Sequence, residues 1–72
     1  MEFIKINNQI FNLTEIAHAT VRGEYIYIKV KGSEEADCVG FEGRLKADRE
    51  ETARKFFNEV LWERLSQIKR EA

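Results

Sequence analysis

The two side chains best suited to nucleophilic catalysis each occur once in this sequence. Cys38 is the only cysteine and His18 the only histidine among the 72 residues. A thiol becomes a nucleophile when a base stands within hydrogen-bond reach of it. These two residues fall on different predicted strands, and no serine or carboxylate is spaced to assist His18. We therefore predict no catalytic residue and expect that the protein is not an enzyme.

The acidic residues Glu34, Glu35 and Asp37 are the strongest candidates for binding a hard cation. They lack the regular alternation and the backbone glycine of a calcium loop, so the segment Gly32–Asp37 is interpreted as a solvated loop. One cysteine and one histidine exclude a Cys/His zinc cluster within a single chain. The four glycines are scattered, which excludes a glycine-rich phosphate-binding loop. The sequence predicts neither a metal site nor a cofactor.

Aromatic and basic side chains share one face of a predicted hairpin. In proteins that bind single strands, each base stacked on a ring contributes about 1–3 kcal/mol, while lysine and arginine follow the phosphates. This interleaving predicts a single-stranded nucleic-acid surface, whereas the net charge of −1 gives no support to strong duplex binding. The alternative is an ordinary solvated sheet face, because tyrosine favours strands without any ligand. The candidate residues are His18, Arg22, Tyr25, Tyr27, Lys29 and Lys31.

The same face is a candidate dimer interface. Phe3, Ile10 and Ile16 are expected to lie on it beside Tyr25 and Tyr27, because one helix cannot cover both faces of a sheet. Exposed apolar patches larger than about a few hundred Å² usually mark an interface. A chain this short also buries only about 60% of its unfolded surface, and a homodimer would compensate for the small core. The alternative is that the first strand is twisted or re-registered, so that these side chains are buried in the monomer.

Two residues of the predicted helix depart from its apolar pattern. Trp62 lies far round the helix from the apolar stripe, whereas Arg64 lies near the middle of that stripe. Tryptophan and arginine are enriched at interface hot spots, so both are candidates for contact with a second subunit or another protein. Alternatively, Trp62 packs over the sheet edge and Arg64 snorkels from a frayed helix end.

Two predicted hairpins position most of these residues. In the first, Asn7 and Asn8 form a two-residue loop, since asparagine tolerates positive φ. In the second, Gly23 and Glu24 form the loop, and aliphatic residues alternate with polar ones on both sides of it. Each loop fixes a register in which the apolar residues of both strands share one face. The predicted pairs are Ile4 with Phe11 in the first hairpin, and Val21 with Ile26, Ala19 with Ile28 and Ala17 with Val30 in the second.

A C-terminal amphipathic helix completes the predicted fold. After a short strand over residues 38–41, Asp48 followed by Glu51 forms a capping-box variant, so the helix is predicted over residues 48–70. The predicted class is α+β, with an antiparallel β-meander of four to five short strands over residues 1–47. One C-terminal amphipathic α-helix then packs on one sheet face, and residues 1–72 form a single domain. The apolar stripe of the helix consists of Ala53, Phe56, Phe57, Val60, Leu61, Leu65 and Ile68.

This order of elements resembles small β-meander domains closed by a terminal helix, including the whirly-like coactivators that bind single-stranded DNA as dimers. The resemblance covers the layout alone, so no residue role carries over. The N-terminus has no basic region leading into an apolar run, and nowhere do about 18 apolar residues follow one another. With its single thiol, the sequence predicts a cytoplasmic protein that does not contact a membrane.

Overall fold

Within residues 2–71, which the computed structural model describes (the backbone alone for 69–71), five strands form two antiparallel sheets. The first sheet pairs β1 (Phe3–Ile6) with β2 (Gln9–Asn12). A 3-10 turn, η1 (Leu13–Glu15), leads into the second sheet. Its strands lie in the order β3 (Ile16–Arg22), β4 (Tyr25–Val30) and β5 (Asp37–Gly40).

One continuous helical segment follows the sheets. It consists of α1 (Lys46–Phe56), a π-helical turn η2 (Phe57–Leu61) and α2 (Trp62–Glu71). The α+β class and the order of strands followed by a C-terminal helix are confirmed. The meander is, however, divided between two sheets.

The first hairpin has the predicted register. Ile4 pairs with Phe11 across a two-residue loop, and Asn7 in that loop has a φ of 57°. Asparagine tolerates this left-handed conformation because its short polar side chain can bond locally. Ile4, Ile6 and Phe11 are buried on one face as a result.

The second hairpin follows the predicted register from Arg22 back to His18 and then departs from it. Val21 pairs with Ile26 and Ala19 with Ile28, as predicted. The predicted pairing of Ala17 with Val30 is wrong, because Ile16 takes that position and the register shifts between Ile16 and His18. A bulge inserts one extra residue into a strand. Here it turns the larger Ile16 toward the core and leaves the small Ala17 exposed, which favours apolar burial.

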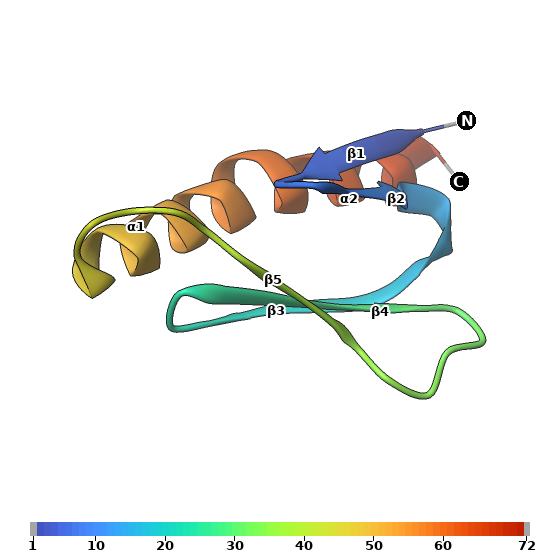
Figure 1. Cartoon of the computed structure of the whole chain (residues 1–72). Coiled ribbons are helices and arrows are strands. Elements are labelled where there is room, and N and C mark those ends of the chain that lie inside the picture. Colours follow the sequence, from blue (N-terminus) through green and yellow to red (C-terminus); the bar gives the residue numbers. More distant parts are fainter. Residues whose placement is uncertain (1, 72) are drawn as a thin grey trace.

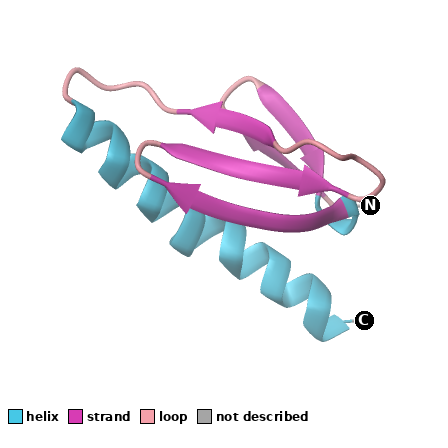
Figure 2. Ribbon diagram, turned by 90° about the horizontal axis from the view of Figure 1, so that it is seen from below, coloured by secondary structure: helices cyan, strands magenta, loops and turns pink. Residues whose placement is uncertain are grey.

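The hairpin of β1 and β2 lies on the same side of the three-stranded sheet as the helix (Figure 1). Seen from the opposite side, the helix passes behind the sheet beside β3, and the hairpin lies behind β5 (Figure 2). One core joins the three parts. The largest fully buried side chains come from the first hairpin (Ile6), the 3-10 turn (Leu13), the three-stranded sheet (Ile26, Ile28, Val39) and the helix (Leu61).

The helix begins earlier than its predicted cap. Its N-cap is Leu45, whose side chain caps nothing, and the Leu45 carbonyl accepts hydrogen bonds from the Asp48 and Arg49 amides at 3.1 and 3.2 Å. The predicted N-cap role of Asp48 is therefore wrong. Lys46 and Ala47 are good helix formers and extend the helix backwards. Asp48 instead lies in the first turn, where a carboxylate complements the helix dipole.

The π-helical turn alters the predicted apolar stripe. Leu61 is fully buried, but Val60 is 38% exposed. A π-turn accommodates one more residue per turn than an α-helix and so rotates the side chains that follow. The expectation that Val60 belongs to the buried stripe is therefore wrong, whereas Ala53 and Leu61 occupy it as predicted.

Candidate functional site

The edge of β3 is the longest open strand edge among the described residues. β3 has seven residues and pairs with β4 alone. Arg22 and Tyr25 close a two-residue loop, so they form the hydrogen-bonded pair of that hairpin. By alternation, the amide and carbonyl groups of Ala19 and Val21 point away from β4. These groups can pair with another strand.

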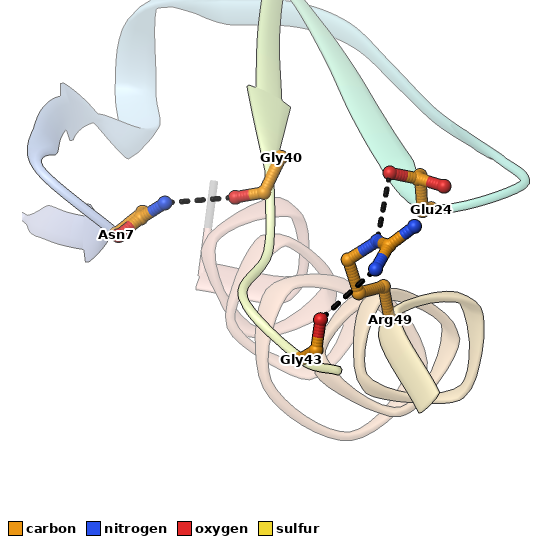
Figure 3. Close-up of polar contacts among 5 residues, drawn as sticks. All are labelled: Asn7, Glu24, Gly40, Gly43 and Arg49. Carbon is orange, nitrogen blue, oxygen red and sulfur yellow. Dashed lines mark hydrogen bonds and ion pairs between the residues drawn. The ribbon is translucent and has the colours of Figure 1, made fainter. Parts of the chain in front are cut away.

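The edge of β5 is shorter, and one of its ends is occupied. It has four residues, and the Asn7 amide Nδ2 donates a hydrogen bond of 2.8 Å to the Gly40 carbonyl (Figure 3). A Cβ at Gly40 would lie 3.1 Å from the Tyr25 ring, so that ring packs directly on the glycine. The first hairpin and Tyr25 thus occupy this end of the sheet.

An apolar groove separates β3 from the helix, and we call it the β3 groove. A cavity of about 390 Å³ lies between the start of β3 and the residues Phe57, Trp62 and Leu65. It continues into a second cavity of about 580 Å³ that shares Ile16, Ala17 and Leu65 and reaches Ile68. The second half of the helix extends beyond the outline of the sheet beside β3 (Figure 2). The open edge therefore has an apolar wall along its inner side.

Trp62 and Ile16, two predicted interface residues, both line the β3 groove. Trp62 is 56% exposed and lies on the β3 side of the helix, next to Leu65. The sequence places it far round the helix from the apolar stripe, with packing over the sheet edge as the alternative. The placement of Ile16 on the outer sheet face is wrong, because the bulge turns it to the inner face.

The other predicted interface residues are distributed over different surfaces. Phe3 and Ile10 lie on the outer face of the first hairpin, 49% and 70% exposed, where they are diagonal neighbours. They do not adjoin Tyr25 and Tyr27, because the two sheets turn their inner faces toward one core and their outer faces away from it (Figure 1). Arg64 donates a hydrogen bond of 2.9 Å from a guanidinium nitrogen to the Glu2 carboxylate and so joins the helix to the N-terminal segment.

The outer face of the three-stranded sheet gathers most of the predicted nucleic-acid residues. A shallow depression of about 280 Å³ there is lined by His18, Arg22, Tyr27 and Lys29. The predicted inclusion of Lys31 is wrong, because the chain leaves β4 at Val30 and Lys31 instead lines the β3 groove. The other five candidates form one surface, which we call the outer face and which consists of His18, Arg22, Tyr25, Tyr27 and Lys29.

The two tyrosines on the outer face are close but not stacked. Their ring centroids are 6.4 Å apart and the ring planes meet at 54°. Repulsion from the neighbouring Cys38 sulfur raises the pKa of the Tyr27 phenol above 10.0, with smaller contributions from burial and a hydrogen bond with Cys38, while Arg22 opposes the shift. The Tyr27 hydroxyl is therefore uncharged near neutral pH.

His18 and Cys38 lie on opposite edges of the three-stranded sheet, with β4 between them. Strands are about 4.8 Å apart, which separates the two backbones by about 10 Å and prevents a direct hydrogen bond. Among the described residues, no three His, Cys, Asp or Glu side chains gather in a way that could hold a metal ion. The part of the chain that the structure describes also has no helix with the length and apolar character needed to cross a membrane.

Comparison with known proteins finds no matching family, no similar curated protein and no similar solved structure. The surfaces must therefore be interpreted from their own chemistry. The sequence did not indicate that Phe57, Leu65 and Ala19 line a groove. The available signal was the run of residues 16–22, which contains no proline, lysine or acid of the kind that usually protects an edge strand.

Proposed function

We propose that this protein is a non-enzymatic homodimerisation domain in which two copies pair through their β3 edges. The observation that carries the proposal is the open seven-residue edge of β3 beside the apolar β3 groove. An edge strand offers a row of backbone donors and acceptors to any matching strand. A second copy of β3 supplies the same groups in reverse order.

Antiparallel pairing of a strand with its own copy is compatible with a two-fold axis. A pairing centred on Thr20 would place Ala19 opposite Val21 of the partner subunit. All these side chains are small or β-branched, so they allow the backbones to approach. The two sheets would then form one continuous sheet of six strands, since each contributes three.

The helix supports the same arrangement. Because it extends past β3, it would lie over the seam and over the first strand of the partner (Figure 2). The partner would cover the exposed part of the Trp62 side chain, which lies beside the apolar residues that line the groove. Burial of a large apolar side chain contributes about 1.5–3 kcal/mol, and aromatic anchors next to a fully desolvated centre are typical of interface hot spots.

The charges of β3 favour pairing as well. The strand contains no carboxylate and no lysine, and its one arginine, Arg22, lies at the loop end. Natural edge strands usually avoid association through inward charges, lysine or proline. β3 has none of these three devices. Its bulge, which is another, lies between Ile16 and His18 and leaves the edge from Ala19 to Val21 regular.

Sedimentation equilibrium at high micromolar concentrations tests the proposal. The wild-type chain is expected to have twice the monomer mass of 8.5 kDa. Ala19→Pro removes an outward amide while the β3–β4 ladder keeps its bonds, and it should give a monomer. Ala17→Lys, at an exposed position, and Trp62→Ser should do the same.

Ile10→Ser is the matched control. Ile10 is even more exposed than Trp62 but lies on the outer face of the first hairpin, so its dimer should persist. A wild-type chain that remains monomeric at high micromolar concentration would remove the proposal. A dimer that dissociates in Ile10→Ser but not in Ala17→Lys would assign the interface to the first hairpin instead.

A further inference from the structure

We infer that the outer face of the three-stranded sheet binds single-stranded nucleic acid, with Tyr25 and Tyr27 as stacking platforms and Arg22 and Lys29 as phosphate contacts. The inference goes beyond dimerisation, because all the residues that it uses lie on the surface of a single chain. It uses the face opposite the core, which neither the helix nor the first hairpin covers (Figure 1).

The charged side chains that the three strands place on this face are all basic. β3, β4 and β5 together contain a single carboxylate, Asp37, and its pairing with Ile28 assigns it to the inner-face side of the sheet. The charged residues that line the outer depression are Arg22 and Lys29, with His18 beside them. The chain as a whole has a net charge of −1, so this segregation is local. A polyanion is therefore complementary in charge to the outer face.

The register places the cations on both sides of the rings. Arg22 pairs with Tyr25 at the loop end of the hairpin, and His18 pairs with Lys29 at the other end, with Tyr27 between. From Tyr25 to Lys29 the strand rises about 13 Å at roughly 3.3 Å per residue. A backbone that follows β4 would therefore meet a cation, two rings and another cation in succession.

The rings select single strands over duplexes. Because the Tyr25 and Tyr27 planes meet at 54°, two bases that stack on them cannot remain stacked on each other. Bases of a duplex are already stacked and paired, whereas those of a single strand can separate and lie on aromatic side chains. An acidic peptide would use the cations but gains nothing from the rings.

The proposed dimer would enlarge this surface without being required for it. Pairing of the β3 edges about an axis perpendicular to the sheet would put both outer faces on the same side. A long oligonucleotide could then contact both copies and bind more tightly than a short one through effective concentration. The Ala17→Lys variant should lose this length effect but keep binding to one face.

Fluorescence anisotropy with a labelled oligothymidylate at low salt tests the inference. Tyr25→Val should weaken binding roughly 5- to 150-fold, the factor that corresponds to one lost stacking contact, whereas Tyr25→Phe should bind nearly as well as wild type. The slope of log K against log salt should be about −0.7 for each phosphate neutralised. Arg22→Gln and Lys29→Gln should each make that slope shallower.

Lys5→Gln is the matched charge control, because Lys5 is exposed on the outer face of the first hairpin, away from the proposed surface. It should leave affinity unchanged. Circular dichroism of each variant separates lost binding from lost folding. The inference would be overturned by the absence of binding at low salt, by an equal effect of Lys5→Gln and Lys29→Gln, or by equal affinity for polyglutamate. Tighter binding to duplex would also overturn it, and all these results are independent of whether the chain dimerises.

Discussion

Asn7 and Gly40 are joined by a hydrogen bond of 2.8 Å between the amide nitrogen Nδ2 of Asn7 and the Gly40 carbonyl, across 33 positions of the chain. This contact fixes the loop of the first hairpin against the last strand of the sheet (Figure 3). The pairing registers require that the Gly40 carbonyl point outward from β5, and the Asn7 amide satisfies it there. The Gly40 end of the β5 edge is thereby occupied, and β3 has the longer open edge.

Asn7→Asp should destabilise the protein by about 1–3 kcal/mol, because a carboxylate oxygen replaces the donor and faces the Gly40 carbonyl. Aspartate tolerates the φ of 57° at this position as asparagine does, so the backbone of the loop is preserved. Urea unfolding measures the change. Asn8→Asp makes the same chemical change at the adjacent exposed residue and should stay within about 0.5 kcal/mol of wild type. Equal losses at both positions would contradict a role for the Asn7 hydrogen bond.

Glu24→Gln should lower stability by about 1 kcal/mol, since the Arg49 guanidinium connects the β3–β4 loop to the segment before the helix. Arg49 Nε donates to Glu24 at 3.0 Å and a second guanidinium nitrogen donates to the Gly43 carbonyl at 2.9 Å (Figure 3). The control is Glu51→Gln, which removes the exposed ion pair with Lys55 and should cost at most about 0.5 kcal/mol. Thermal unfolding of both variants measures the two losses of stability. A larger loss for Glu51→Gln than for Glu24→Gln would contradict the role assigned to the Arg49 contacts.

Leu61→Ala should cost about 2–5 kcal/mol, because it removes a fully buried side chain from the centre of the core. Val60→Ala should cost well under about 1 kcal/mol, since Val60 is already 38% exposed. The contrast tests the π-helical turn, because a regular apolar stripe would bury both residues. Similar losses in urea unfolding would mean that the stripe continues without that turn.

Tyr27 should ionise above pH 10.0 in the folded protein. The raised pKa means that the folded state holds this proton more tightly than the unfolded state does. Its contribution to stability is fully present below pH 10.0 and is lost as the pH rises through the folded pKa. Phenolate absorbance of the Tyr25→Phe variant isolates Tyr27.

The first cause of this shift is the Cys38 sulfur, so adding Cys38→Ala should move the midpoint downward. A midpoint that does not respond to Cys38→Ala would mean that burial, and not the thiolate, dominates. The Tyr25→Phe variant itself serves as the reference for this comparison.

The fold class, the register of the first hairpin and that of the second from Arg22 back to His18 could be predicted because turn chemistry and alternation agree. Asn7 supplies the positive φ of one loop and Gly23 that of the other, and each loop length fixes which residues face the core. Local rules could not predict the bulge at Ala17. It depends on the gain from burying Ile16, which exists only once the helix is in place.

The same limit applies to the candidate surfaces. Alternation correctly put Tyr25 and Tyr27 on the outer face, but periodicity does not reveal that the chain divides into two sheets whose outer faces point apart. The predicted patch of Phe3, Ile10 and the tyrosines was therefore wrong as a contiguous surface. Trp62 was misplaced because a regular helical wheel does not include the π-turn that precedes it.

Amide hydrogen exchange at Ala19 and Val21 tests the central claim most directly, because these two amides point from β3 toward the proposed second copy. At low micromolar concentration they should exchange rapidly, and at millimolar concentration they should be protected. The Thr20 amide, which bonds to β4, should be slow at both. Rapid exchange of Ala19 and Val21 at every concentration, with Thr20 protected, would contradict pairing through the β3 edge.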